Sequence, residues 1–381
     1  MKKRIFIQIF LINLIFIESK SMLNSSSTFS NNMEISIRQV CVPFTNLQNK
    51  PTKNNFNGQY PVLLKDAPEH ESQLLFGEYV LFEDKEEKLN NQTWIFVYCL
   101  EQFDAKLAPL TGWIKKQDTV KTDYIEKKDI VLTTKNWTTL YSQDNIPLLD
   151  IPIGTKTKFI SLISKNNIVE HRIKTPNNII TNTYSDKIKL FKQKISKYNN
   201  NDISKKIRKN IKNITPIFLN MPYSWGGRTP YSANSYFQTS IDCSGFVNLV
   251  YRCCGLAIPR NSGDLYEYCN KLNSGAELET GDFVFLADIE TKKINHVLLF
   301  LQDQILQESI GSQEPYANRT IEFKDRFCNN KENLNSGEEI GNKIIYFGSI
   351  LNDIEKIKQI SEIFLNCELI LANKDNAKID D

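Results

Sequence analysis

Short runs in which every second residue is apolar dominate the first half of the chain. Between Val42 and Asp118 they include SQLLFGEYVLFED, QTWIFVYCL and LTGWIKKQ, and a second set extends from Asp129 to Asn178. A period of two places alternate side chains on opposite faces of a strand. The pattern predicts two small all-β modules in tandem, each an antiparallel barrel, at residues 41–120 and 121–182.

The pattern changes after these modules. Residues 183–212 are rich in Lys and Asn with an intermittent helical period, which is typical of a linker that ends in a helix. Residues 213–350 mix helical and strand patterns and are predicted to form a third domain. Residues 351–381 place Ile354, Ile357, Ile360, Phe364 and Ile370 at near-helical spacing, which predicts an amphipathic helix that closes this domain. The predicted fold class is α+β.

The first residues have the pattern of an export signal. Lys2, Lys3 and Arg4 precede the apolar run from Ile5 to Ile17, and the small residues Ser19 and Ser21 follow. We interpret residues 1–21 as a signal peptide and 22–40 as a polar linker. The alternative is an uncleaved membrane anchor, but the run falls short of the roughly 20 residues needed to span a bilayer. We therefore expect an exported protein of the periplasm or cell envelope, without stable membrane insertion after signal removal.

Composition excludes some partners and cofactors. The formal net charge is only +3, from 47 Lys and Arg against 44 Asp and Glu, and no basic run interleaved with aromatics indicates nucleic acid. The eight cysteines show no paired CxxC motifs that would indicate zinc, and whether any form disulfides stays open. We expect a monomer with no metal and no organic cofactor.

One cysteine stands where a helix begins. Cys243 lies in DCSG, followed by FVNLVYRCC, whose apolar positions form one stripe before Gly255, a typical C-cap residue. A helix N-terminus favours the thiolate, which is the nucleophilic form, and its free N–H groups can stabilise an oxyanion. The alternative is a merely buried cysteine, as we expect for Cys253 and Cys254 in the same helix.

A base for this thiol is easy to choose, because the chain has three histidines. His70 and His171 fall in the all-β modules. His296 opens the strand-like run HVLLFL in the same domain as Cys243, so we assign it as the general base rather than as a satisfied core residue.

A third polar group is needed to hold the second imidazole nitrogen. The next strand, ILQES, offers Gln307 and Glu308, and the hairpin register decides between them. If Leu301 pairs with Ile305, Glu308 lies diagonally on the face of His296, whereas a turn one residue shorter selects Gln307. We favour Glu308.

Five motifs in the third domain carry a family resemblance. They are YSWGGR from Tyr223, DCSGFV from Asp242, GLAIPR from Gly255, GDFVF from Gly281 and NHVLLFL from Asn295. In order and spacing they resemble the NlpC/P60 cysteine peptidases. QLLFGEYV and GWI further resemble the first of two bacterial SH3 domains in the γ-D-glutamyl-diaminopimelate endopeptidase subgroup.

The resemblance implies a papain-like catalytic domain preceded by two SH3-like barrels. It implies that Cys243 is the nucleophile, His296 the base and Glu308 the third polar group, where many members have histidine. It also implies a Tyr223 hydroxyl at the active site, and an oxyanion contact from the backbone N–H of Cys243. No cofactor is implied.

Substrate contacts follow from the same resemblance. Asp242 and Ser244 resemble contacts to a free amine end of the substrate, and Trp225 lies in the substrate-side YSWGGR motif. Glu78 resembles an acid that recognises a free N-terminal amine, but Leu110 replaces the tyrosine expected to assist it. The familiar PRDA reads PRNS here, and the stretch YSANSYFQTS before DCSG is unusually long.

These resemblances predict a peptidoglycan hydrolase that cleaves the amide between γ-D-glutamate and diaminopimelate in murein stem peptides. Whether intact wall or recycled murein fragments are the substrate stays open. Two alternatives remain: a non-catalytic wall-binding SH3 protein, and a papain-like acyltransferase or amidase.

Overall fold

A computed structural model describes residues 35–53, 58–126, 130–165, 168–184, 186–191, 200–233 and 238–376. The signal peptide predicted at residues 1–21 lies outside the described residues. Among those that are described, no helix has the length and apolar character needed to cross a membrane.

The first module is a seven-stranded antiparallel sheet with the strand order β3-β2-β6-β5-β4-β1-β7. Its strands are β1 (Ile35–Val40), β2 (Phe44–Gln48), β3 (His70–Leu75), β4 (Tyr79–Leu89), β5 (Gln92–Phe103), β6 (Pro109–Lys115) and β7 (Thr119–Thr122). The boundary predicted at residue 41 is wrong, because β1 pairs with β4 and β7.

Both faces of this sheet are buried, which the alternating pattern alone does not reveal. Ile95 and Val97 pack in one apolar cluster, whereas Trp94 and Phe96 pack in another. Since neighbouring residues of a strand point to opposite faces, the two clusters lie on opposite sides of β5.

The second module is another seven-stranded sheet, in the order β10-β9-β13-β12-β11-β8-β14. Its strands are β8 (Ile130–Thr133), β9 (Trp137–Tyr141), β10 (Pro147–Pro152), β11 (Lys156–Lys165), β12 (Ile168–Lys174), β13 (Ile180–Tyr184) and β14 (Ile188–Phe191). The predicted boundary at 182 is wrong, because β14 lies in the expected linker and pairs with β8. Closure of either sheet into an SH3-like barrel stays a prediction.

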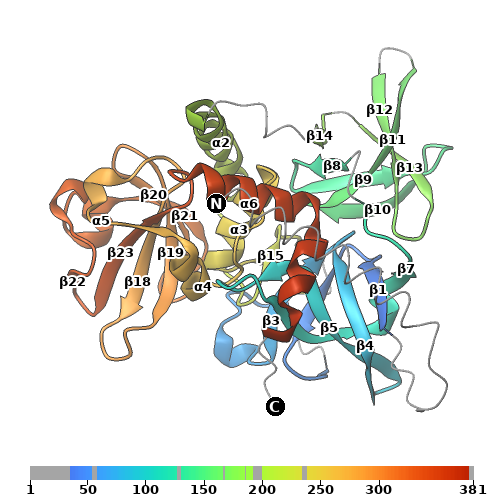
Figure 1. Cartoon of the computed structure of the whole chain (residues 1–381), viewed down its shortest axis with the longest axis horizontal. Coiled ribbons are helices and arrows are strands. Elements are labelled where there is room, and N and C mark those ends of the chain that lie inside the picture. Colours follow the sequence, from blue (N-terminus) through green and yellow to red (C-terminus); the bar gives the residue numbers. More distant parts are fainter. Residues whose placement is uncertain are drawn as a thin grey trace, which may run out of the picture. The chain divides into compact units, whose positions relative to one another are not determined.

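The third domain packs helices on both faces of an antiparallel sheet, in the order β17-β23-β18-β19-β20-β21 (Figure 1). The strands are β17 (Asn270–Leu272), β18 (Phe283–Asp288), β19 (Ile294–Gln302), β20 (Ile305–Ser309), β21 (Asn318–Glu322) and β23 (Lys343–Ser349), with β22 (Glu339–Ile340) paired to β23. Helices are α2 (Asn200–Ile214), α3 (Cys243–Cys253), α4 (Ser262–Tyr268), α5 (Phe323–Phe327) and α6 (Ile354–Leu365).

Alternate side chains of β19 point to opposite faces of the sheet and pack in two different apolar clusters. Val297 and Leu299 pack in the cluster that contains α3, whereas Leu298 and Phe300 pack in the cluster that contains α5. Helix α2, predicted at the end of a linker, is part of the domain, because Ile203, Ile207 and Ile211 pack in the cluster of α3.

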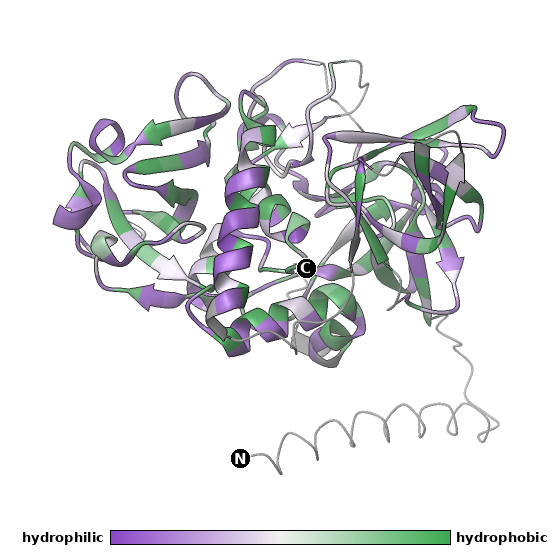
Figure 2. Ribbon diagram, turned by 90° about the horizontal axis from the view of Figure 1, so that it is seen from above, coloured by the Kyte–Doolittle hydropathy of each residue, from purple (hydrophilic) through white to green (hydrophobic). Residues whose placement is uncertain are grey.

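The C-terminal helix is shorter than predicted. Helix α6 ends at Leu365, and a 3-10 helix, η7 (Cys367–Asn376), carries Ile370. Polar and apolar residues are interleaved along the helices (Figure 2), and the apolar side of α6 packs in two clusters. Ile357 and Ile360 pack with α3, whereas Phe364 and Ile370 pack with Phe103 of β5.

Candidate active site

Cys243 is the first residue of α3, as predicted. Asp242 caps the helix, and its Oδ1 accepts a hydrogen bond from Gly245 N at 2.5 Å. The GG turn of YSWGGR lies directly against this helix start, because Gly227 O accepts from Asp242 N at 3.1 Å. A Cβ on Gly245 would stand 2.1 Å from Gly227 O, so the close approach requires glycine in DCSG.

His296 on β19 is bonded to Glu308 on β20. Strand pairs Leu299↔Gln307 and Phe300↔Leu306 establish the register in which Glu308 lies diagonal to His296. The distance from His296 Nε2 to Glu308 Oε2 is 2.8 Å. A bulge between Phe300 and Gln302 shortens the hairpin tip without changing this register.

Gln307, the other candidate for the third polar group, points away from His296. Its Nε2 donates to Thr215 O at 2.9 Å and to Asn318 Oδ1 at 2.6 Å.

The imidazole of His296 is bonded to Glu308 and lies close to Cys243. Burial opposes the charged ring, but hydrogen bonds with Cys243 and Glu308, together with their negative charges, raise the pKa of His296 to about 9. Since Nε2 bonds Glu308, Nδ1 is the nitrogen left to face the sulfur. The sulfur is mostly covered, with Cys243 8% exposed.

Glu308 is completely buried, and three cationic groups surround its carboxylate. Arg319 Nη2 lies 2.8 Å from Oε1, and Arg326 Nε lies 3.3 Å from the same oxygen. Burial would raise the pKa of Glu308, but the bond and charge of His296, followed by the two arginines, lower it to about 2. We call His296, Glu308, Arg319 and Arg326 the histidine cluster.

Tyr223 lies close to Cys243. Its pKa is raised by burial and then by the charges of Cys243 and Asp242. A Cβ on Gly311 would stand 2.4 Å from the Tyr223 ring, so this glycine makes room for the aromatic side chain. Trp225 is half-buried, and its backbone N–H donates to Val62 O at 2.8 Å.

Asp242 and Ser244 share a buried arginine that the sequence did not indicate. Arg260 of the PRNS motif donates to Asp242 Oδ2 at 2.8 Å and to Ser244 Oγ at 2.8 Å. Its Nε donates to Ser72 Oγ of the first module, also at 2.8 Å. The predicted contact of Asp242 and Ser244 with a substrate amine stays a prediction, and in this structure Arg260 occupies both.

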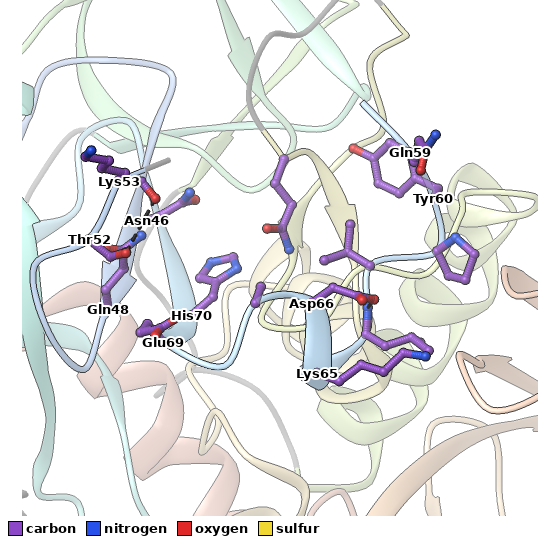
Figure 3. A pocket seen from close by; sticks show the side chains of 15 residues that line it. Asn46, Gln48, Thr52, Lys53, Gln59, Tyr60, Lys65, Asp66, Glu69 and His70 are labelled. Carbon is purple, nitrogen blue, oxygen red and sulfur yellow. Dashed lines mark hydrogen bonds between the residues drawn. The ribbon is translucent and has the colours of Figure 1, made fainter. Parts of the chain in front are cut away.

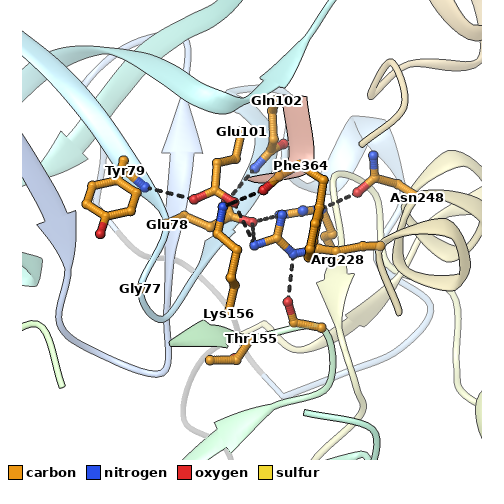
Figure 4. Close-up of polar contacts among 12 residues, drawn as sticks. Gly77, Glu78, Tyr79, Glu101, Gln102, Thr155, Lys156, Arg228, Asn248 and Phe364 are labelled. Atoms are coloured by element: carbon orange, nitrogen blue, oxygen red, sulfur yellow. Dashed lines mark hydrogen bonds and ion pairs between the residues drawn. The ribbon is translucent and has the colours of Figure 1, made fainter. Parts of the chain in front are cut away.

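The amine-binding role predicted for Glu78 is not supported. Its carboxylate is buried, and Oε1 lies 2.7 Å from Arg228 Nη1 and 3.2 Å from Arg252 Nη2 (Figure 4). Glu101 Oε2 lies 2.9 Å from both Arg252 and Lys156. An acid enclosed by two guanidinium groups has no face left for a substrate amine.

We call Glu78, Glu101, Lys156, Arg228 and Arg252 the interface cluster. It joins the two sheets to α3, and Lys156 Nζ also donates to Phe364 O of α6 at 2.9 Å.

His70 lies nearer to the site than its place in the first module suggested. A Cβ on Gly226 would stand 3.1 Å from its ring, and burial lowers the pKa of His70 to about 4, so this imidazole is neutral at pH 7. It lines a polar pocket of about 390 Å³ together with Gln48, Tyr60 and Gln238 (Figure 3). The pocket adjoins the Tyr223–Trp225 segment, because Gln238 Nε2 donates to Trp225 O at 2.8 Å.

The eight cysteines are all free thiols. Across the described ranges, no group of three or more His, Cys, Asp and Glu side chains has the arrangement of a metal site.

Comparison with known proteins finds a family match within the third domain. Residues 220–323 match the NlpC/P60 family. A γ-D-glutamyl-L-lysine dipeptidyl-peptidase of Bacillus cereus is 27% identical over 267 residues, which cover 68% of this chain and 72% of that protein. The peptidoglycan endopeptidase RipB of Mycobacterium tuberculosis is 28% identical over 123 residues, which cover 28% of this chain and 49% of RipB.

A solved structure shares the fold over a longer span. An NlpC/P60 family protein from Bacillus cereus superposes with a TM-score of 0.59 at 21% identity. The match covers 75% of this chain and 94% of that one, so the common fold extends well beyond residues 220–323.

Proposed function

The chain carries an NlpC/P60 domain, and we propose that it is a cysteine peptidase that cleaves the stem peptides of peptidoglycan. The observation that carries the proposal is the imidazole of His296, which bonds Glu308 through Nε2 at 2.8 Å and lies beside Cys243. A nucleophile, a base and a group that orients the base are the requirements for attack by a thiol on an amide.

The reaction begins with the sulfur of Cys243 as a thiolate beside protonated His296. The thiolate attacks the carbonyl carbon, and the carbonyl oxygen becomes an oxyanion. The backbone N–H of Cys243 is a suitable donor to this oxyanion, because the first N–H groups of a helix have no partner within the helix. The hydroxyl of Tyr223, a residue close to Cys243, is our second candidate donor.

Collapse of this intermediate breaks the carbon–nitrogen bond. His296 gives its proton to the leaving amine, and the acyl group stays on the sulfur as a thioester. His296 then takes a proton from water, and the resulting hydroxide attacks the thioester. The acid product leaves, and the imidazolium–thiolate pair is restored. Throughout, Glu308 holds Nε2, so Nδ1 always faces the sulfur.

For the substrate, we propose the amide between γ-D-glutamate and diaminopimelate. The name of the Bacillus cereus relative supports a γ-D-glutamyl bond, and RipB supports peptidoglycan as the polymer. We propose that the reaction takes place outside the cytoplasmic membrane, on the basis of the signal predicted at residues 1–21.

Replacing Cys243 by alanine tests the proposal. We expect purified Cys243→Ala protein to fold as the wild type does and to release no product from L-Ala-γ-D-Glu-diaminopimelate. Wild-type products should show the mass of one added water, whereas acyl transfer would leave the acyl group on a new amine. Full cleavage by Cys243→Ala, or wild-type binding to peptidoglycan without any cleavage, would contradict the proposal.

A further inference from the structure

Two arginines lie behind the group that orients the catalytic imidazole. In β21, Arg319 is the direct cross-strand partner of Glu308, and its Nε and Nη2 donate to Oε1 at 3.0 and 2.8 Å. Arg326 reaches the same carboxylate from α5, with its Nε 3.3 Å from Oε1 and 3.4 Å from Oε2. The oxygens are thus divided: Oε1 belongs mainly to Arg319, and Oε2 bonds His296.

A carboxylate at this place needs such partners. Glu308 is 0% exposed, and burial of an isolated carboxylate favours its neutral form. If Glu308 were neutral, it would lose the negative charge that holds the imidazolium of His296. Without Arg319, the carboxylate would be free to rotate about the last bond of the Glu308 side chain. Arg319 removes that freedom, because its Nε and Nη2 both donate to Oε1 and leave Oε2 to His296, so rotation of the carboxylate would break bonds at both oxygens.

The two arginines also change the net charge around the imidazole of His296. With His296 protonated, the histidine cluster has three positive groups and one negative group, so the arginines more than offset the charge of Glu308. The other charged groups near the imidazole are Cys243 at the start of α3 and the Asp242–Arg260 pair beside it. Each arginine therefore opposes the positive charge that protonation adds to the imidazole of His296. The two donors of Arg319 meanwhile hold the carboxylate that keeps the ring in place.

We propose that Arg319 and Arg326 are positioning residues of the active site, which act on His296 through Glu308 by fixing the carboxylate and offsetting its charge. The proposal rests on the peptidase function proposed above. It assigns one task to the paired N–H donors of Arg319, which we call its fork, and another to its positive charge. Two substitutions can separate these tasks.

The experiment compares Arg319→Gln, which loses both tasks, with Arg319→Lys, which keeps the charge and loses the fork. The first readout is the pH dependence of Cys243 alkylation by iodoacetate, an anion whose reaction slows when the imidazolium loses its charge, followed by mass spectrometry of the peptide that contains Cys243. The second is kcat and KM for peptide cleavage. Alkylation requires no substrate, so the inference is tested even if the proposed substrate proves wrong.

For Arg319→Gln we expect the upper pH limit of alkylation to rise by about one unit, because a cation beside the imidazolium is gone. We expect kcat to fall about tenfold with little change in KM. Arg319→Lys should keep the wild-type pH limit and still lose kcat. Arg326→Gln should shift the limit in the same direction by less, because its contacts are longer.

The matched control is Arg208→Gln, which breaks an arginine–carboxylate pair in the same domain. Arg208 Nη1 lies 2.9 Å from Asp282 Oδ1, outside the histidine cluster. We expect this variant to lose stability but to keep the wild-type pH limit. The proposal would be overturned if Arg319→Gln kept the wild-type pH limit of alkylation, or if it lost no more kcat than Arg208→Gln. It would also be overturned if Cys243 in the wild type showed the alkylation profile of free cysteine.

Discussion

The histidine cluster contains one carboxylate, two guanidinium groups and an imidazole, whereas the interface cluster contains two carboxylates, three cations and no imidazole. Side chains in the interface cluster are at most 3% exposed, while His296 is 15% exposed and faces Cys243. Similar ion pairs therefore surround the imidazole that we propose as the general base and, elsewhere, connect the two sheets to α3. The two clusters should respond differently to the loss of one carboxylate.

The largest effect on stability is expected from Glu78→Gln. The substitution leaves the buried cations Arg228 and Arg252 without the charge they share, and breaking a buried pair in this way costs about 3–5 kcal/mol. Urea denaturation measures the loss. Glu86→Gln in β4, the strand that follows Glu78, is the control, because its pair with Lys116 is partly exposed and should cost less than about 1 kcal/mol. Equal losses in the two variants would show that the interface cluster is not needed for stability.

A pH-dependent effect of intermediate size is expected from His296. Its pKa rises from 6.5 to about 9 on folding, so its stabilising contribution is complete below pH 6.5 and is lost as pH rises through 9. The pKa of Glu308 falls from 4.5 to about 2, so its contribution is complete above pH 4.5 and is lost as pH falls through 2. The pair should stabilise the fold most between pH 4.5 and 6.5.

Urea unfolding at pH 5.5 and 9.5 measures this change. We expect the wild type to lose up to about 3 kcal/mol more than His296→Asn between the two pH values. Cys243→Ala should lose less than the wild type, because the sulfur supplies part of the shift. The interpretation fails if His296→Asn shows the same pH dependence as the wild type.

The comparison also predicts a loss of activity without a matching loss of fold. Glu308→Gln keeps an oxygen near His296 but removes the charge, so we expect kcat to fall about 100-fold. Glu78→Gln should lower activity only in proportion to its unfolded fraction. Titration of reactive Cys243 gives the number of folded sites for both variants. A fall in kcat per folded site in Glu78→Gln equal to that in Glu308→Gln would remove the distinction.

Parts of the site that depend on local pattern were predictable from the sequence. Asp242 and Cys243 follow from a cap and an apolar stripe, and Glu308 follows from hairpin register once His296 is chosen. Strand β1 was missed because a Ser- and Asn-rich stretch precedes it, and β14 because its four residues are too few for a pattern.

The basic residues that connect distant parts of the chain could not be predicted, for a different reason. Arg260 bonds Ser72 across 188 positions, and Lys156 bonds Phe364 across 208, and no period in the sequence encodes such pairs. Glu78 shows the same limit, because a family position suggested an exposed acid where two distant arginines enclose it. Arg319 alone carried a usable signal: the register that selects Glu308 also places Arg319 opposite it, once β21 is recognised.

The smallest effect is expected at a helix-capping carboxylate outside both clusters, which bonds two backbone N–H groups and the side chain of Asn270. Asp353 caps α6, and its Oδ1 accepts from Glu355 N at 2.9 Å and from Lys356 N at 3.2 Å. Asp353→Ala should cost about 1 kcal/mol in urea denaturation, and Asp353→Asn less, because an amide oxygen can still accept from the backbone. Since α6 packs against α3 through Ile357 and Ile360, a loss near that of Glu78→Gln would mean that fraying reaches the core. Carboxylate burial would then no longer explain the ranking of these variants.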